Sequence, residues 1–326
     1  MEESLSIALG GNVSLFSNGT LALMIALRAL DITDGEVITT PFTFPATPHS
    51  ITWSGAKPIF CDVNSDTMCI DATKIEALIT KDTKAILATH IYGIACDIEK
   101  IQQIADKHHL KVIYDAAHAF MTTYKGKPIA SYGDISMFSF HATKIFHTIE
   151  GGCLVYNNTD LKEARHLLRN FGIQDEENVV LSGINAKMNK IQASIGLINL
   201  ENIDNIIAHR KDMYNCYTRH LKGIYALTVP HGTGGENNMH QYFIVRISKE
   251  AQISRDELYL LLKEYNILTR KYFYPLCTNY KHYNTIRWNV PKAKIVSQEV
   301  LALPFYHNLA LQDITKICSI MKFLMQ

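Results

Sequence analysis

The chain has 326 residues, of which 47% are hydrophobic and 19% are charged, and its formal net charge is +1. These values describe an ordinary globular protein with enough residues for one large domain and a smaller one. A charge this close to zero gives no indication of nucleic-acid or acidic-membrane binding, and no apolar stretch approaches the ~20 residues of a membrane-spanning helix.

The cysteines and histidines show no metal or disulfide pattern. The seven cysteines are an odd number without a C-x-x-C pair, which favours free thiols in a reducing cytoplasm. The 14 histidines are scattered without HExxH spacing, so we expect no metal site. The N-terminus, Met1-Glu2-Glu3-Ser4, starts acidic and lacks the basic and apolar parts of a signal peptide.

The first half of the chain alternates between short apolar runs and amphipathic segments. A strongly apolar helical stretch covers 21–30, and a second helix is predicted over 97–109, where Asp97 is a suitable N-cap. Six apolar runs are predicted strands: 36–40, 57–63, 85–90, 111–114, 135–140 and 152–156. Strands and helices that alternate in this way predict an α/β fold with a mostly parallel sheet flanked by helices.

The second half of the chain has a different pattern. Residues 191–221 read as one long helical segment, of the kind that often connects two domains. Beyond it we expect a glycine-containing loop at 223–238, a strand at 241–247 and helices at 254–265 and 313–324. The predicted division is a large domain over 1–205 and a small C-terminal domain over 206–326.

Two side chains at the ends of predicted strands indicate the chemistry. Asp115 follows the apolar run at 111–114, and Lys144 comes shortly after the run at 135–140. The carboxyl ends of neighbouring strands in an α/β sheet meet at the ligand site. Pyridoxal phosphate (PLP) requires this pair, a lysine for a Schiff base and an aspartate that keeps the pyridine nitrogen protonated. Singly, such an Asp is also a helix cap and such a Lys is more often a surface residue, but the pair predicts a PLP enzyme.

A phosphate site is indicated by the turn Ser17-Asn18-Gly19-Thr20, which opens the helix at 21–30. The free backbone N–H groups and the positive dipole end of a helix start suit a phosphate, although an isolated turn of this kind is usually an ordinary N-cap. Ser139, shortly before Lys144, is a second phosphate donor in this hypothesis.

Other cofactors are not indicated by the sequence. No GxGxxG motif follows a strand, so a nicotinamide cofactor is unsupported, and no GxxxxGK[ST] motif is present, which excludes a nucleotide-hydrolysing P-loop. Phe42 and Phe44 are core residues in one interpretation, and in the other one of them stacks on a cofactor ring.

At these residues the chain resembles the nucleotide-sugar aminotransferases of the DegT family, which are fold-type I PLP enzymes. The resemblance extends over nearly the whole chain and depends on motifs in a fixed order. They are Ser17-Asn18-Gly19-Thr20, Thr40-Pro41-Phe42-Thr43-Phe44, Gly55-Ala56-Lys57-Pro58, His90-Ile91-Tyr92-Gly93, Asp115-Ala116-Ala117-His118, Lys144, Glu150-Gly151-Gly152 and Gly183-Ile184-Asn185. The resemblance implies a mixed, mostly parallel sheet flanked by helices, with a smaller C-terminal α+β domain.

The resemblance also implies which residues contact the PLP ring. Lys144 would form the Schiff base and then move a proton, Asp115 would bind the pyridine nitrogen, and Phe44 would stack on the ring. His118 stands where the family often has Gln, and it would contact the ring hydroxyl.

The phosphate contacts implied by the resemblance come from two subunits. Gly19, Thr20 and Ser139 would hold the phosphate within one subunit, and Asn185 would reach it from the partner subunit. The resemblance therefore implies a homodimer with an active site shared across the interface.

A narrower resemblance concerns the substrate. Tyr272-Phe273-Tyr274-Pro275-Leu276, preceded by Arg270, is similar to a segment of the enzymes that aminate C4 of dTDP-4-keto-6-deoxyglucose to give dTDP-viosamine. This similarity implies that Arg270, Tyr272 and Tyr274 bind substrate.

The chain departs from the family pattern in two places. Only 16 residues precede Ser17, whereas the family has several dozen residues there, which form an N-terminal arm. Lys187 and Asn189 replace the Arg and the acidic residue that usually follow the position of Asn185.

The function implied by the resemblance is the transfer of an amino group from L-glutamate to a nucleotide-linked keto sugar in the cytoplasm, for surface-polysaccharide biosynthesis. The alternatives are an aminotransferase for a 3-keto sugar or for a UDP- or GDP-linked 4-keto sugar, and a non-catalytic PLP-fold sensor or partner subunit. A PLP-dependent sugar dehydratase is disfavoured, because the family members with that activity lack the Schiff-base lysine and Lys144 is present.

Overall fold

The computed structural model describes residues 1–158, 161–232 and 234–326. Its main element is a seven-stranded sheet with the order β1-β9-β8-β5-β4-β2-β3. The strands are β1 (Asn12–Phe16), β2 (Glu36–Thr39), β3 (Lys57–Phe60), β4 (Thr83–Thr89), β5 (Lys111–Asp115), β8 (Ile135–Ser139) and β9 (Gly152–Tyr156). Every neighbouring pair is parallel except the two pairs that include β9. The predicted α/β fold with a mostly parallel sheet is confirmed.

All six predicted strands are present, and six of their twelve ends differ from the prediction by one to three residues. The largest difference is at the predicted strand 57–63, which ends at Phe60. The antiparallel edge strand β1 was not predicted, because it is short and its apolar run is interrupted by Ser14.

Helices cover both faces of the sheet. Successive side chains of a strand point to opposite faces, and here both sets are apolar and need to be covered. Ala85 and Leu87 of β4 belong to the core under one face, whereas Ile86 and Ala88 belong to the core under the other. On the first face lie α2 (Gly19–Ala29) and α3 (Ala46–Trp53); on the second lies α5 (Ile98–His108), with Asp97 as the expected N-cap. The remaining helices of this half are α1 (Glu2–Leu9), α4 (Ala72–Ile75) and α6 (Leu161–Leu168).

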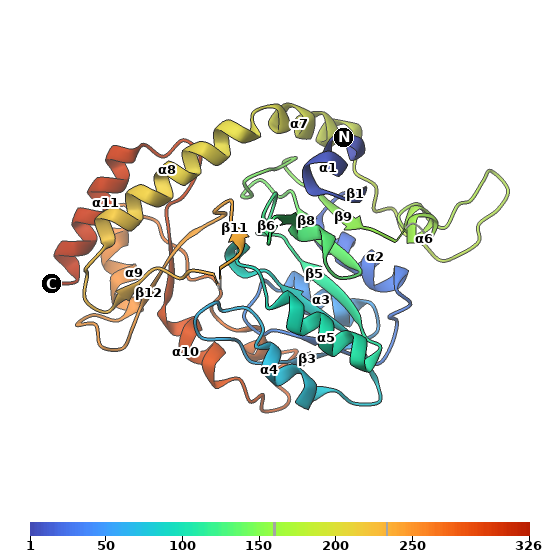
Figure 1. The fold of residues 1–326 in the computed structure, drawn as a ribbon, viewed down its shortest axis with the longest axis horizontal. Helices are drawn as coiled ribbons and strands as arrows, with labels where there is room; N and C mark the ends of the chain where they lie inside the picture. The colour runs from blue at the N-terminus through green and yellow to red at the C-terminus, as the bar shows by residue number, and fades with distance from the viewer. Residues whose placement is uncertain (159–160, 233) are drawn as a thin grey trace.

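The prediction of one continuous helix over 191–221 is wrong. The segment forms two helices, α7 (Lys190–Glu201) and α8 (Ile203–Leu221), which are separated at Asn202, where φ is −106° and ψ is 9°. The side chain of Asn189 and that of Gln192 form a capping box that fixes the start of α7. Figure 1 shows α8 extending from α7 to the C-terminal helices.

The C-terminal part has its own small sheet and core. The sheet is formed by β10 (Leu227–Thr228), β12 (Phe243–Ile247) and β13 (Val300–Leu303), and it packs with α9 (Arg255–Glu264) and α11 (Leu311–Leu324). The region 223–238 was expected to be a loop, but its described residues include β10 and β11 (Glu236–Asn237). The strand β11 pairs with β6 (Thr123–Tyr124), which also pairs with β7 (Lys127–Pro128).

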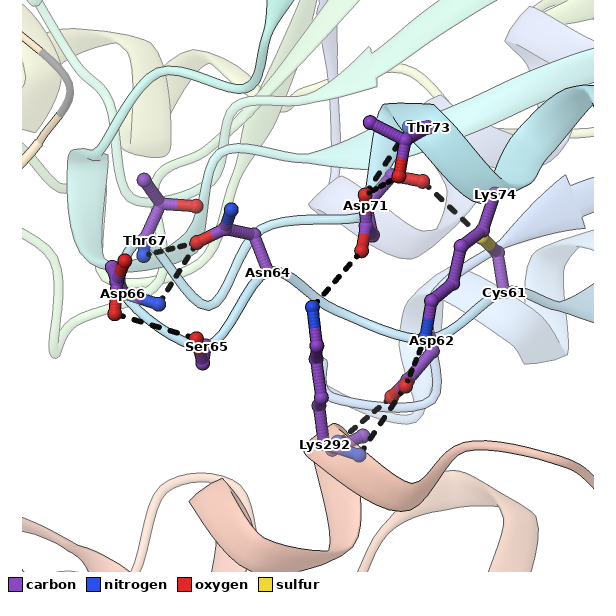
Figure 2. A network of polar contacts seen from close by, with 11 residues as sticks. Cys61, Asp62, Asn64, Ser65, Asp66, Thr67, Asp71, Thr73, Lys74 and Lys292 are labelled. Carbon is purple, nitrogen blue, oxygen red and sulfur yellow. Dashed lines mark hydrogen bonds and ion pairs between the residues drawn. The ribbon is translucent and has the colours of Figure 1, made fainter.

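One segment of the second half lies against the first half of the chain. The helix α10 (Pro291–Glu299) has no side-chain cap of its own, and the carboxylate of Asp62 accepts its free N–H groups from Lys292 at 3.2 Å and Ala293 at 2.8 Å. Asp62 also pairs with Lys74 at 2.8 Å, as Figure 2 shows. The division into domains 1–205 and 206–326 stays a prediction. Among the described residues, no helix combines the length and apolar character needed to cross a membrane.

Candidate active site

Asp115 ends β5, which lies between the parallel strands β4 and β8. Its side chain is buried, and it accepts hydrogen bonds from the hydroxyl of Thr47 at 2.6 Å and the backbone N–H of Ala117 at 3.1 Å. Burial raises the pKa of Asp115 from its ordinary value, whereas these two hydrogen bonds and the charge of Lys144 lower it. A buried carboxylate in this position suits a ligand that brings a positively charged donor.

Three buried threonines support Asp115, and none of them was assigned a role from the sequence. The hydroxyl of Thr43 lies 2.9 Å from that of Thr47 and 3.1 Å from that of Thr89. Because Thr47 donates to Asp115, these hydroxyls orient the carboxylate through a connected network. Thr43 falls in the motif at 40–44 and Thr47 follows it, but the residue pattern does not reveal this contact.

Lys144 lies on the loop between β8 and β9, and its amino group faces the same region as Asp115. The Nζ atom is 3.5 Å from the hydroxyl of Tyr242. Burial lowers the pKa of Lys144 to about 8, although Asp115 and Tyr272 act in the opposite direction. A lysine with this pKa is partly neutral near physiological pH, which a nucleophile or base requires.

His118 is buried and has a defined pattern of hydrogen-bond roles. Its Nδ1 atom accepts the backbone N–H of Tyr92 at 3.2 Å, so the neutral ring carries its proton on Nε2. Its ring stacks on Phe273 at 5.7 Å and meets Tyr242 edge-on at 5.1 Å. Burial, with a smaller effect of Lys144, lowers the pKa of His118 well below its ordinary value. The residue is therefore a neutral donor at this position.

The backbone at the start of α2 lies close to Ser139 at the end of β8 and to Gly152 at the start of β9. A Cβ atom added to Gly19 would lie 3.3 Å from Cβ of Ser139, and one added to Gly152 would lie 2.8 Å from the backbone N of Gly19. The side chain of Asn18 caps the helix by accepting the N–H of Leu21 at 2.9 Å. The structure thus brings the predicted phosphate residues Gly19 and Ser139 together at a helix N-terminus, with Thr20 exposed next to them.

Two other residues predicted to bind the cofactor lie on the surface. Phe44 is 57% exposed, and Asn185 is exposed next to Ala186, whose carbonyl accepts the N–H of Ser17 at 2.8 Å. The Asn185 side chain makes no hydrogen bond within the described part of the chain. Its role toward a partner subunit stays a prediction.

The three predicted substrate residues occupy different environments. Tyr272 is half-buried, its ring lies 5.5 Å from that of Tyr242, and its hydroxyl is close enough to Lys144 to affect the pKa of that amine. Tyr274 is half-exposed and its ring faces Arg255 at 5.3 Å, and Arg270 is exposed. The structure therefore places Tyr272 at the site, and the substrate roles of Tyr274 and Arg270 stay predictions.

The residues present fit PLP. The buried carboxylate of Asp115 accepts from one hydroxyl and one backbone N–H, both of them uncharged, and a protonated pyridine nitrogen would add a positively charged donor. Lys144 has the lowered pKa that an attacking amine needs, and the glycine-lined start of α2 suits the phosphate. The PLP requirements for a base, a counter-ion and an anion site are met within one region.

This fold and site define a fold-type I PLP-dependent aminotransferase. Residues 7–322 match the DegT/DnrJ/EryC1/StrS aminotransferase family, and the chain belongs to this family. It is 42% identical over 329 residues to the dTDP-4-amino-4,6-dideoxy-D-glucose transaminase of Escherichia coli, covering 98% of this chain and 88% of that protein. It is 40% identical over 300 residues to the protein of the same name from Shigella dysenteriae, covering 91% of this chain and 82% of that protein.

A solved structure agrees with these relatives. The crystal structure of DesI in the presence of its TDP-sugar product superimposes with a TM-score of 0.94 at 32% identity, covering 99% of this chain and 83% of DesI. The family and the fold inferred from the motifs are confirmed.

Proposed function

We propose that the protein transfers the amino group of L-glutamate to dTDP-4-keto-6-deoxy-D-glucose and forms dTDP-4-amino-4,6-dideoxyglucose, for a surface polysaccharide such as O-antigen. The relatives named for this product, at 40% and 42% identity, support the substrate. The observation that carries the chemistry is the convergence of the partly buried Lys144 with the buried Asp115 and His118.

Each of these residues has a defined task in the reaction. PLP, when bound, withdraws electrons from the carbon that carries the transferred amino group. The carboxylate of Asp115, oriented by Thr47, holds the proton on the pyridine nitrogen. The Nζ atom of Lys144 accepts a proton and returns it, which its lowered pKa permits. His118 offers its Nε2–H to the ring oxygen.

A cavity next to Tyr242 is the position that we propose for the part of the substrate that is larger than an amino acid. A cavity of about 300 Å³ is bordered by Tyr92, Tyr242 and Asn238. Tyr242 also contacts Lys144, so one side chain connects this cavity with the reacting amine, although Lys144 itself does not border the cavity.

We also propose a homodimer in which Asn185 completes the phosphate site of the partner subunit. Exposed apolar side chains lie on both sides of Asn185 in sequence, on α7 and on the preceding segment. They are Phe171, Ile173, Val179, Val180, Ile184, Ile191, Leu197 and Ile198. Apolar surface of this extent is typical of a protein interface.

The seven cysteines are free in the structure, which supports the proposed cytoplasmic location.

Mass spectrometry of products tests the substrate. The protein is incubated with ¹⁵N-glutamate and with dTDP-, UDP- and GDP-linked 3-keto or 4-keto sugars, and the Lys144→Ala variant is the control. We expect ¹⁵N only in the dTDP-4-amino-4,6-dideoxyhexose. Amination of a different sugar would show that the proposed substrate is wrong but that the protein is a sugar aminotransferase. The absence of product from the whole panel would favour a non-catalytic role.

A further inference from the structure

The backbone around Lys144 is held by a side chain from the C-terminal part of the chain. The amide of Gln241 accepts the N–H of Ile145 at 2.8 Å through its oxygen and donates to the carbonyl of Thr143 at 2.9 Å through its nitrogen. One buried side chain therefore bonds the residue on each side of Lys144. A loop fixed at both flanking peptide groups has little freedom to redirect the side chain between them.

The next residue along the chain contacts the lysine itself. The hydroxyl of Tyr242 accepts a hydrogen bond from Nζ of Lys144 at 3.5 Å, and Nζ lies 5.8 Å from the ring centre. The Tyr242 ring is in turn fixed edge-on by His118 at 5.1 Å and by Tyr92 at 6.1 Å. Gln241 and Tyr242 thus act on the backbone and the amine of the same residue.

A buried arginine fixes the position of this dipeptide. Arg210 of α8 donates to the carbonyls of His240 at 2.9 Å, Gln241 at 2.7 Å and Phe305 at 3.2 Å. Because charged donors form the stronger hydrogen bonds, these contacts hold residues 240–241 firmly where the chain enters β12. The C-terminal part of the chain with the β10-β12-β13 sheet, here called the C-terminal lobe, therefore has a rigid connection to the loop of Lys144.

We propose that Gln241 and Tyr242 are positioning residues. Before Lys144 has bonded to PLP, they orient its amino group so that it can form that bond. Gln241 fixes the backbone of the loop, and the hydroxyl of Tyr242 accepts a hydrogen bond from the free amino group of Lys144. The proposal rests on the assigned PLP-dependent function. It adds that the C-terminal lobe, rather than the large sheet alone, determines where the reactive amine points.

Covalent attachment of PLP to the cofactor-free protein tests this role without measuring turnover. The variants are Tyr242→Phe, which removes only the hydroxyl, and Gln241→Met, which keeps the length of the side chain and removes both hydrogen bonds. The control is Tyr217→Phe, which removes a buried hydroxyl that donates to Pro304 at 2.9 Å in the C-terminal lobe. The rate at which PLP becomes attached to Lys144 is measured by absorbance. Pyridoxine phosphate, which has no aldehyde and cannot bond to lysine, reports the non-covalent affinity of the site.

We expect each test variant to attach PLP about tenfold more slowly than wild type or slower still, as the loss of one hydrogen bond in Tyr242→Phe and of two in Gln241→Met implies. The affinity for pyridoxine phosphate should change less than twofold, and the control should match wild type in both measurements. Unchanged attachment rates in both test variants would overturn the positioning role alone. A parallel loss of pyridoxine phosphate affinity would also overturn it, because the residues would then only maintain the shape of the site. Failure of the wild-type protein to attach PLP would overturn the assigned function and the proposal with it.

Discussion

At the scale of single residues, burial determines the charge states around the expected cofactor position. Burial raises the pKa of Asp115 and lowers the pKa of Lys144 and of His118, so each is shifted toward its neutral form. For Lys144 and His118 a neutral side chain is the reactive or donating form. For Asp115, the hydrogen bonds from Thr47 and Ala117 counteract burial and favour the carboxylate.

Replacement of Asp115 by Asn should preserve the fold and remove most of the activity. An amide cannot hold the proton on the pyridine nitrogen, and the loss of this electrostatic contribution should cost at least ~3 kcal/mol, or on the order of a hundredfold in rate. Steady-state kinetics with glutamate as donor measures the effect, and circular dichroism checks the fold. Rates near those of wild type would reduce Asp115 to a capping residue.

The rate at which the cofactor-free protein attaches PLP should depend on pH through Lys144. Only the neutral amine attacks the aldehyde, so the rate should rise with pH, with a midpoint near about 8 rather than near the ordinary value of 10.5. Asp115→Asn should move this midpoint to lower pH, since the carboxylate raises the pKa of Lys144. Stopped-flow absorbance provides the profile, and a midpoint near 10.5 would show that the amine is solvated.

The sequence allowed the prediction of Lys144 and Asp115, because each follows an apolar run that had to be a buried strand. It did not allow the prediction of Thr47, Tyr92, Gln241 or Tyr242. Thr47 is 68 positions from Asp115, and Tyr242 is 98 positions from Lys144. Such contacts depend on how distant elements meet, and no local periodicity records them.

At the scale of helices and strands, the site depends on three adjacent connections at one edge of the sheet. The N-terminus of α2, the end of β5 and the loop after β8 meet because β5 and β8 are parallel neighbours and β9 places Gly152 against Gly19. The parallel strands were predictable from their continuous apolar runs. The break between α7 and α8 at Asn202 was not, since both sides of it have helical periodicity.

Helix α10 gives a prediction at this scale. Asp62→Ala removes the cap of α10 and the partner of Lys74, and should lower the free energy of unfolding by about 2–3 kcal/mol, the range for a lost cap plus hydrogen bonds to a charged group. Asp66→Ala, at an exposed aspartate whose carboxylate accepts from the hydroxyl of Ser65 at 3.3 Å, is the matched control and should change stability by less than ~0.5 kcal/mol. Equal effects in urea unfolding would show that Asp62 does not hold α10.

At the scale of the whole molecule, the site joins segments from both halves of the chain and, as proposed, from a second subunit. The large sheet supplies Asp115, Ser139 and the start of α2, and the C-terminal lobe supplies Gln241 and Tyr242. The exposed apolar side chains on α7 and the preceding segment are the proposed contact with the partner. The sequence predicted helical structure over 191–221, whereas a sequence pattern does not distinguish a face that packs within the chain from one that packs between chains.

Assembly and cofactor binding should therefore be linked. If Asn185 completes the phosphate site of the partner, dilution should release PLP and dissociate the dimer together, because a ligand that binds only the dimer stabilises it by mass action. Asn185→Ala should weaken PLP binding by about 1–3 kcal/mol, as expected for a lost hydrogen bond to a charged group. Analytical ultracentrifugation of PLP-loaded protein provides the measurement. A fully active, PLP-loaded monomer would contradict the shared site.

The visible spectrum of the purified protein tests the central claim most directly, namely that Lys144 and Asp115 form a working PLP site. Wild-type protein supplied with PLP should absorb near ~400–430 nm, and this band should disappear when L-glutamate is added. Lys144→Ala should lack the band while it retains PLP non-covalently. A colourless wild-type protein that takes up no added PLP, or a Lys144→Ala variant that keeps both the band and its response to glutamate, would contradict the account.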